Sequence, residues 1–387
     1  MDERAEIVGS LDEALGPGAA ALVEWARRRR LLNGVAVGVV REGRCLVWAM
    51  GAEARARFEL GSLTKTYTAE LLAMLLKRGV VRLEDPVAMY LPEGKVERGG
   101  ARPVTLLDLA THRSGLPRIP PWMNAGSSNP YADYTMKDLE NYLAGQRLQV
   151  PAGVKFAYSN LGYSVLGYAL GRAAGVGFEE LMEREILRPL GMVDTSLAMA
   201  GRKQELLKGH TQTGLPARHW TFDACAPCGA LCSTAEDQVK WMRWLLEDVG
   251  RLSLQVKAAA PGEGIGLGWM IRPGGKACWH NGATYGFSSW MSLDLERRAG
   301  VVVLSNRMSV RLVNALGARY EGALRGEAVK PLKGSYGWAL GVVMDFLRIW
   351  TWPFRPILRL PRWLALPVFL GVVYGVTWLV EWLWAWR

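Results

Sequence analysis

The pattern of hydrophobic and polar positions in the first fifty residues predicts a helical segment followed by a β-hairpin. Residues 1–32 have apolar positions at helical spacing, interrupted at Gly16-Pro17-Gly18. Two apolar runs follow at 35–40 and 45–49, and the turn signal Glu42-Gly43 lies between them. We therefore expect a helical segment ahead of the main domain and an antiparallel pair of strands at the start of that domain.

The pattern changes to helical and then returns to strands later in the chain. Residues 62–77 are apolar nearly all round, which predicts a buried helix. Between about 86 and 216, apolar helical stretches alternate with Pro/Gly-rich turns, which indicates a mostly helical insert. Strand patterns reappear at 266–271, 287–293 and 301–304. Strands early and late with helices between them predict an α+β fold, in which both ends of the domain build one antiparallel sheet flanked by N- and C-terminal helices.

The C-terminal part of the chain has a different composition. Residues 363–386 carry one charged side chain, Glu381, and a helix of this length can cross a hydrocarbon core of roughly 30 Å. Tryptophans lie at both ends of the segment, as is typical of membrane interfaces. We predict a transmembrane helix at 363–386. The preceding apolar stretch, 336–354, carries two charges near its middle, so we interpret it as interfacial.

These patterns divide the chain into four expected parts. They are an N-terminal helical segment (1–32), the main domain (33–330, with the insert at about 86–216), a linker with the interfacial segment (331–362) and the transmembrane helix (363–386).

The composition indicates a folded protein and gives little support to nucleic-acid binding. Hydrophobic residues make up 50% of the chain and charged residues 21%, which is typical of a globular protein and not of a disordered one. The net charge is +11, but the arginines are scattered and no basic stripe interleaved with aromatics occurs in the main domain. We expect a small-molecule or peptide substrate and membrane lipid as partners, and no nucleic acid.

The cysteines suggest neither a disulfide framework nor a metal site. Their number is odd and their spacing uneven, which fits a reducing compartment. Three of them form the sequence Cys225-x2-Cys228-x3-Cys232, but a zinc site needs a further cluster, which Cys278 and His280 could supply only in principle. Small apolar cysteines in a tight loop are commoner, so we predict no metal.

The charges near the chain ends predict the side of the membrane. The first residues are acidic and lack the pattern of a secretory signal. Arg355, Arg359 and Arg362 precede the predicted transmembrane helix, and only Arg387 follows it. The positive-inside rule therefore favours a catalytic domain on the cytoplasmic side. Two alternatives remain open: a start upstream of Met1, or a second span in the apolar stretch before the arginines.

Candidate chemistry begins with Ser62-Leu63-Thr64-Lys65. Ser62 and Lys65 lie three positions apart at the start of the predicted helix, so their side chains share a face. The helix N-terminus adds free amide donors and partial positive charge at that point. A lysine in an apolar helix loses its proton more easily than in water and can then act as a base toward the serine. The alternative is an N-cap serine followed by a solvated lysine.

Two further polar clusters occur downstream, Tyr158-Ser159-Asn160 and Trp279-His280-Asn281-Gly282. A tyrosine can shuttle a proton, and an asparagine can orient the lysine and a substrate carbonyl. The glycine would let a substrate lie close against the edge of the following strand. The alternatives are a turn tyrosine with a capping asparagine, and a histidine that forms only structural hydrogen bonds.

The three clusters occur in the order and at the spacing of the serine β-lactamase and penicillin-binding protein superfamily. In particular, the chain resembles the class C β-lactamase-like serine hydrolases, which include D,D-peptidases and carboxylesterases. The resemblance covers roughly residues 30 to 310 and includes family-like stretches outside the catalytic clusters. These stretches are 58–66, 83–87, 111–117, 189–192 and 304–307.

The resemblance implies a role for each candidate residue, and a reaction that needs no cofactor. Ser62 would be the acylated nucleophile and Lys65 the group that helps to deprotonate it. Tyr158 would pass a proton to the leaving group. The other implied roles are substrate positioning by Asn160, His280 and Gly282, and an oxyanion hole made by the backbone N–H groups of Ser62 and Ala283.

One departure from the family pattern affects the expected substrate. His280 stands where many relatives have a lysine, and a histidine is only partly charged near neutral pH. This leaves room for ester or amide substrates. We therefore expect a membrane-anchored serine hydrolase that cleaves an amide, peptide or ester through an acyl-Ser62 intermediate. The alternatives are a D,D-carboxypeptidase or β-lactamase acting on cell-wall peptides, an acyltransferase, and a non-catalytic interaction protein that keeps the penicillin-binding fold.

Overall fold

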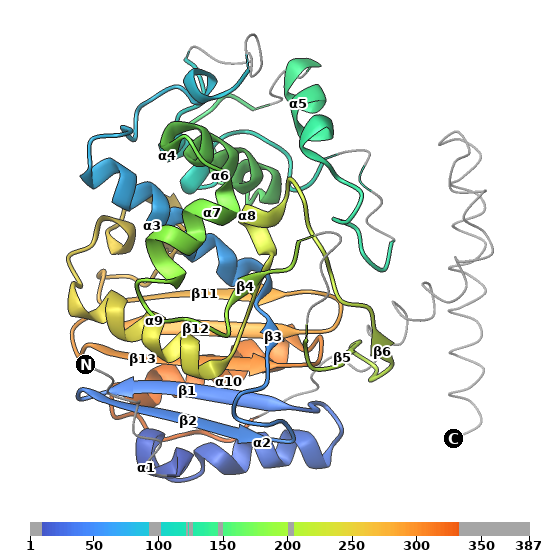
Figure 1. Ribbon diagram of the computed structural model, residues 1–387. Coiled ribbons are helices and arrows are strands. Elements are labelled where there is room, and N and C mark those ends of the chain that lie inside the picture. Colours follow the sequence, from blue (N-terminus) through green and yellow to red (C-terminus); the bar gives the residue numbers. More distant parts are fainter. Residues whose placement is uncertain are drawn as a thin grey trace, which may run out of the picture. The chain divides into compact units, whose positions relative to one another are not determined.

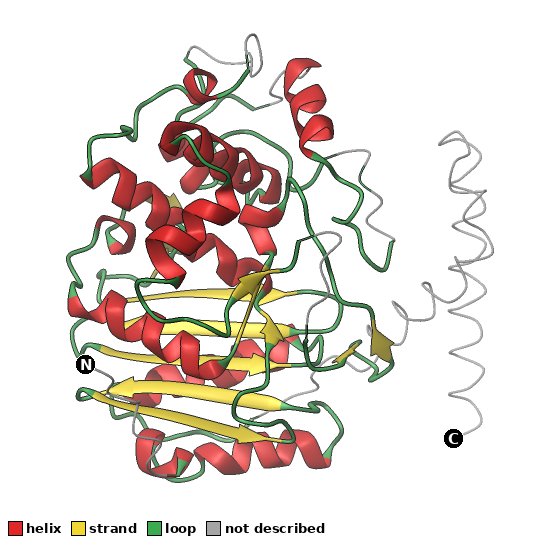
Figure 2. Cartoon of the chain, in the orientation of Figure 1, coloured by secondary structure: helices red, strands yellow, loops and turns green. Residues whose placement is uncertain are grey.

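A large antiparallel sheet with helices on both faces forms the centre of the domain (Figures 1 and 2). The structure is a computed structural model, and it describes residues 10–92, 102–120, 123, 127–145, 150–199 and 205–332. The strand order is β2-β1-β13-β12-β11-β10-β9-β8. The bounds are β1 (Val35–Arg41), β2 (Arg44–Met50), β8 (Ala258–Ala260), β9 (Glu263–Ile265), β10 (Met270–Ile271), β11 (Ala277–Ala283), β12 (Ser288–Asp294) and β13 (Ala299–Ser305).

The first and last long strands of the domain are neighbours in this sheet. β1 pairs with β13 from Val35, opposite Ser305, to Val40, opposite Gly300. The predicted hairpin is confirmed, since β1 and β2 pair directly across the turn at Glu42-Gly43. An antiparallel sheet built from both ends of the domain is therefore what the structure contains.

Alternate residues of the central strands face two different cores. Val301 and Val303 of β13 pack on one side, whereas Val302 and Leu304 pack on the other. The first core is covered by α1 (Leu11–Leu15), α2 (Ala19–Arg28) and α10 (Val310–Leu324). The second is covered by α9 (Ala235–Glu247) and by the helical region beyond it. Because both faces are covered, these strands are apolar at nearly every position.

The helical region surrounds α3 (Thr64–Lys77), which is buried along most of its length. α3 packs against α6 and α8, and the residues just before it, Gly61–Leu63 (η1), pack against β11 and β12. The remaining helical elements of this region are η1 (Gly61–Leu63), η2 (Val87–Tyr90), α4 (Leu106–Ala110), α5 (Met136–Gly145), α6 (Asn160–Ala174), α7 (Phe178–Met182), η3 (Glu183–Leu187), α8 (Ala226–Gly229) and η4 (Leu252–Leu254).

Short strands connect the helical region to the sheet. A small sheet has the order β3-β7-β4, and a separate pair joins β5 to β6. β3 leads directly into η1, so it helps to fix the start of α3. The bounds are β3 (Phe58–Glu59), β4 (Ser196–Leu197), β5 (Gly209–His210), β6 (Pro216–Ala217) and β7 (Leu231–Ser233).

Two strand predictions need correction. The single strand expected at 266–271 is wrong, because the backbone N–H of Gly266 donates to the carbonyl of Trp269 and closes a tight turn between β9 and β10. The cluster from Trp279 to Gly282 was expected just before a strand, but it lies on β11 itself. The polar residues of this cluster concealed a strand that is only partly apolar.

Several predictions concern residues outside the described ranges. The expected transmembrane helix at 363–386, the interfacial segment at 336–354 and the flanking arginines all lie there. Within the described ranges, no helix is long and apolar enough to cross a membrane. The four-part division of the chain stays a prediction.

Candidate active site

Ser62 lies in the short η1 turn, from which α3 continues. The side chain of Thr64 fixes this turn: its hydroxyl donates to the carbonyl of Gly61 at 2.7 Å and accepts from the backbone N–H of Leu231 at 3.0 Å. The turn is thereby bonded both to itself and to β7. Ser62 is held in one backbone conformation before any substrate binds, as nucleophilic catalysis requires.

Lys65 lies on the same face, one turn along the chain. Its Nζ donates to Ser62 Oγ at 3.0 Å and to the carbonyl of Cys228 at 2.7 Å. The side chain is fully buried, and no carboxylate in the described ranges forms an ion pair with it. The structure therefore brings the predicted nucleophile and the predicted base into direct contact. α8 supplies the second anchor, through a backbone atom that no sequence pattern could identify.

Tyr158 lies over the same pair, just before α6. Its ring centroid is 5.0 Å from Lys65 Nζ and 5.1 Å from Cζ of Arg118. The ring of His280 is 6.2 Å away, centroid to centroid. The ring of Tyr158 thus lies beside both cations and beside the third motif, residues 279–282.

His112 supports Tyr158 and was not among the predicted site residues. Its ring packs against Tyr158 with the centroids 4.3 Å apart, and its Nδ1 accepts the backbone N–H of Ser159 at 3.1 Å. Burial, and then the charge of Lys65, hold the pKa of His112 well below 6.5, so the ring is neutral. An uncharged acceptor at this point fixes the backbone beside Tyr158. His112 lies in the family-like stretch 111–117, but the resemblance assigned no role to any residue of that stretch.

Asn160 is the first residue of α6, and Ser159 caps the helix by accepting the N–H of Gly162 at 2.8 Å. The Nδ2 of Asn160 donates to the hydroxyl of Tyr131 at 2.7 Å. Its Oδ1 is buried and has no hydrogen-bond partner in the described part of the chain. Asn160 therefore contacts Tyr131 and not, as had been expected, the lysine.

His280 projects from β11 and is neutral, contrary to the expectation of partial charge. Burial, and secondarily the charge of Lys65, lower its pKa from 6.5 to about 3. Its Nδ1 lies 2.6 Å from the carbonyl of Asn281, so Nδ1 carries the proton and Nε2 does not. The third motif therefore supplies a hydrogen-bonding group and no positive charge.

Gly282 allows a close approach, but the group that approaches is the chain itself and not a substrate. A Cβ at this position would lie 2.0 Å from the carbonyl oxygen of Leu60 and 2.9 Å from the backbone nitrogen of Ser62. Gly61, with φ +54°, makes the reciprocal contact: a Cβ there would lie 2.7 Å from the backbone nitrogen of Ala283. The two glycines let η1 and β11 lie against each other without intervening side chains.

This close approach brings together the two backbone N–H groups expected to form an oxyanion hole. Thr284 donates its N–H to Phe287 across the β11–β12 ladder. Because bonded and non-bonded pairs alternate in an antiparallel ladder, the N–H of Ala283 points away from β12, toward η1. The N–H groups of Ser62 and Ala283 therefore border the same gap, beside Ser62 Oγ.

A cavity of about 630 Å³ opens in front of these groups. Aromatic side chains dominate its walls, which suits an apolar or partly apolar ligand. Sequence patterns identified few of these wall residues, because they come from loops with no motif of their own. They include Tyr131, Phe156, Trp220, Phe222 and Tyr285.

No metal centre accompanies the site in the described ranges, where no group of three or more His, Cys, Asp or Glu side chains could hold an ion. Cys225 and Cys228 are buried at the start of α8, Cys232 is on β7 and Cys278 is on β11.

Comparison with known proteins identifies the family. The family model described as Beta-lactamase matches residues 19–323. The chain belongs to the beta-lactamase family. This places it in the serine β-lactamase and penicillin-binding protein superfamily, as the three motifs predicted. The matched region contains each of the candidate site residues described above.

Two curated relatives show the range of named activities. The chain is 31% identical over 275 residues to D-alanyl-D-alanine-carboxypeptidase/endopeptidase AmpH of Escherichia coli strain K12, covering 64% of this chain and 70% of AmpH. It is 28% identical over 243 residues to a beta-lactamase of Lysobacter lactamgenus, covering 60% of each. Relatives of this chain thus carry different named activities.

Solved structures confirm the α+β fold. A beta-lactamase/D-alanine carboxypeptidase from Yersinia pestis, complexed with citrate, has a TM-score of 0.69 at 24% identity, covering 82% of this chain and 100% of that one. A class C beta-lactamase has a TM-score of 0.71 at 19% identity, covering 85% of this chain and 99% of that one. At these identities the likeness establishes the fold, and the substrate has to be argued from the site.

Proposed function

We propose that this chain is a serine hydrolase that cleaves an amide, peptide or ester bond through an acyl-Ser62 intermediate. The observation that carries the proposal is the 3.0 Å contact between Lys65 Nζ and Ser62 Oγ, beside two converging backbone N–H groups. A nucleophile, a base and oxyanion donors are the minimum set for acyl transfer.

The reaction follows from this arrangement in two halves. Lys65 accepts the proton of Ser62 as Oγ attacks the substrate carbonyl. The N–H groups of Ser62 and Ala283 stabilise the oxyanion, which contributes several kcal/mol, about 3 to 4 for one donor in a comparable site. Tyr158 passes a proton to the leaving group. Water then attacks the acyl-enzyme, and the same groups return Ser62 to its starting state.

A D,D-carboxypeptidase activity is the second candidate, because AmpH is named for that activity and is 31% identical. Neutral His280 leaves room for the broader ester or amide class, since the third motif itself offers no fixed cation for a terminal carboxylate. The two candidates share the acyl-enzyme and differ only in the acyl donor.

One labelling experiment tests the acyl-enzyme and separates the two candidates. The full chain is treated with a fluorescent penicillin and, separately, with a fluorescent alkyl fluorophosphonate. We expect covalent label at Ser62 and none in the Ser62→Ala variant. Labelling by the fluorophosphonate alone favours an esterase, whereas labelling by both reagents favours a D,D-peptidase. A folded protein that reacts with neither reagent would contradict the proposal.

We also propose that the chain is a single-pass membrane protein, anchored by residues 363–386 with its catalytic domain on the cytoplasmic side. Support comes from the apolar composition of that segment and from Arg355, Arg359 and Arg362 before it. Protease treatment of intact spheroplasts tests the side. Digestion of the domain from outside would contradict the assignment.

A further inference from the structure

The cavity in front of Ser62 has an unusual balance of charge. Among its described lining residues there is no aspartate or glutamate, and Arg118 is the one with a permanent charge. His280, which could have supplied a second positive charge, is buried and neutral. Any anionic group that enters this space therefore meets Arg118 as its available counter-ion.

The backbone of Arg118 is fixed to the start of α6. Its carbonyl accepts the N–H groups of Asn160 at 2.9 Å and Leu161 at 3.4 Å. The hydroxyl of Ser159 donates to the carbonyl of Pro117 at 2.6 Å. The residue is exposed, its main chain is tied to the helix that carries Asn160, and it lines one wall of the cavity.

The guanidinium of Arg118 is unpaired. Cζ lies 5.1 Å from the centroid of the Tyr158 ring, and within the described ranges the side chain has neither a hydrogen-bond partner nor a carboxylate partner. An arginine with five free N–H donors that faces a cavity is well suited to bind a carboxylate in bidentate fashion.

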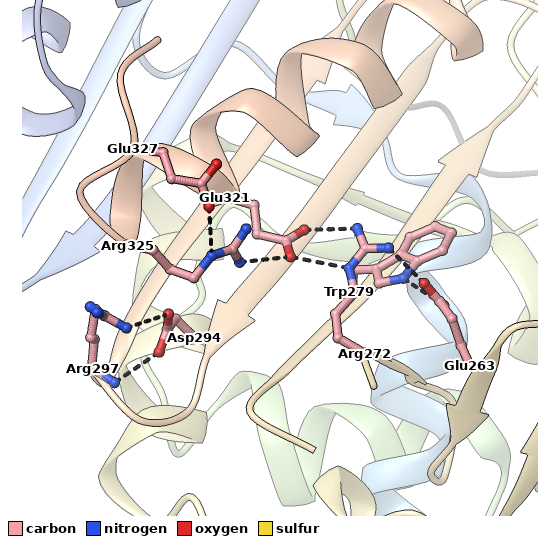
Figure 3. Close-up of polar contacts among 8 residues, drawn as sticks. All are labelled: Glu263, Arg272, Trp279, Asp294, Arg297, Glu321, Arg325 and Glu327. Atoms are coloured by element: carbon pink, nitrogen blue, oxygen red, sulfur yellow. Dashed lines mark hydrogen bonds and ion pairs between the residues drawn. The ribbon is translucent and has the colours of Figure 1, made fainter. Parts of the chain in front are cut away.

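Arg272, which lines a different pocket, provides a contrast (Figure 3). It also packs on an aromatic ring of the cavity, with Cζ 5.1 Å from the centroid of Trp279. However, Arg272 is paired with Glu263 at 2.6 Å and with Glu321 at 2.9 Å, and Glu263 also accepts from the indole of Trp279 at 2.9 Å. Arg272 is thus held by two carboxylates, whereas Arg118 has no carboxylate partner within the described ranges.

We propose that Arg118 is a specificity-determining residue that binds a carboxylate on the leaving group of the substrate. The leaving-group side is inferred because Arg118 lies against Tyr158, the residue proposed to protonate that group. The inference rests on the proposed acyl-Ser62 function and refines its substrate class. In this chain the carboxylate would be bound by Arg118, in the loop that precedes α6, and not by the neutral His280 of the third motif.

Two thioesters that differ in one group test the assignment. The first is benzoyl-glycyl thioglycolate, whose leaving group carries a carboxylate, and the second is the corresponding thioglycolamide, which is neutral. Released thiol is measured for the full-length protein and for Arg118→Ala, Arg118→Lys and Arg44→Ala. Arg44 is an exposed arginine on β2, so it controls for the loss of one positive charge.

We expect Arg118→Ala to lower kcat/KM for the carboxylate thioester by about tenfold or more, and for the amide by no more than about threefold. Arg118→Lys should restore part of the preference, and Arg44→Ala should change neither value. Equal losses with both thioesters, or a wild-type protein without preference for the carboxylate, would overturn the role of Arg118 alone. If the wild-type protein cleaves neither thioester, the proposed function fails and the role of Arg118 fails with it.

Discussion

The cavity has two walls built on different principles. The catalytic wall is formed by η1, the start of α3 and β11, and backbone atoms meet there without side chains between them. The recognition wall is formed by side chains from loops, among them Arg118 and Trp220. Positions on the catalytic wall tolerate few residue types, because each one serves a bond or a close contact. Positions on the recognition wall need only shape and polarity.

Replacing Lys65, on the catalytic wall, should have the largest effect on the rate at which Ser62 is acylated. Lys65→Met keeps the volume but removes the group that contacts Ser62 Oγ at 3.0 Å. We expect acylation by the fluorophosphonate to slow by about 10³-fold, within the usual range for loss of a general base. The measurement is label incorporated against time.

Lys276→Met is a suitable control for Lys65, because Lys276 is exposed and forms a surface ion pair with Glu296. It should label at the wild-type rate. If Lys65→Met kept more than a tenth of that rate while remaining folded, the base would have to be another group.

Gly282→Ala should have the next largest effect, by forcing the two halves of the catalytic wall apart. The new Cβ would lie 2.0 Å from the carbonyl oxygen of Leu60, so η1 has to shift relative to β11. A displacement of about 1 Å at reacting groups commonly costs about 100-fold in rate. We expect kcat/KM to fall by that order in a thioester assay.

Gly177→Ala is the matched control for Gly282→Ala. Gly177 has φ −68°, and a Cβ added there would have no other atom within 4 Å, so alanine fits at this position. Normal activity in Gly282→Ala, with normal activity in the control, would show that the close approach of η1 and β11 is not needed for catalysis.

The sequence predicted residues of the catalytic wall better than residues of the recognition wall, because the first lie in short motifs and the second come from separate loops. Ser62, Lys65, Tyr158 and Gly282 were predictable because each lies in a short motif whose residues are close neighbours along the chain. The sheet built from both ends was predictable for a similar reason, since apolar runs bounded by turn signals identify β1 and β13.

The rest depended on contacts between distant parts of the chain. The carbonyl of Cys228 that holds Lys65 is a backbone atom and has no sequence signature. The neutral state of His280 arises from burial against Lys65, which only the folded chain creates. The polar sequence of β11 concealed a strand, because its partner β12 and not its own composition stabilises it.

His280 should make the stability of the protein depend on pH. Its pKa is about 3 in the folded chain against an ordinary value of 6.5, so the unfolded chain binds a proton over this range and the folded chain does not. The contribution to stability is therefore complete above pH 6.5 and is lost as the pH falls toward 3. The loss is about 1.4 kcal/mol per pH unit for one fully linked group.

Urea unfolding at pH 7 and pH 5 measures this linkage. We expect His280→Gln to lose less free energy of unfolding between these values than the wild-type chain does. His112, whose pKa is lowered in the same direction, remains in both proteins and continues to contribute. An identical loss in the two proteins would mean that His280 titrates normally in the folded state.

The smallest effect is expected on the recognition wall. Buried Glu59 accepts from the backbone N–H of Trp220 at 3.1 Å and pairs with Nδ1 of His219 at 2.8 Å. His219→Ala should loosen the loop that carries Trp220, raising KM by about threefold while kcat stays within about twofold. His219→Asn can restore a donor to Glu59 and should recover the wild-type KM. A large fall in kcat would remove the distinction between the two walls.

The pairing of β1 with β13 has a consequence for synthesis on the ribosome. Val35 meets Ser305 in the finished sheet, so the first hairpin has to wait until some 270 further residues have been translated. Until then β1 presents an unpaired apolar edge, and such long-range closure is slow because its loop entropy is lost before contacts repay it. We expect the nascent chain to need a chaperone at this edge until β13 emerges.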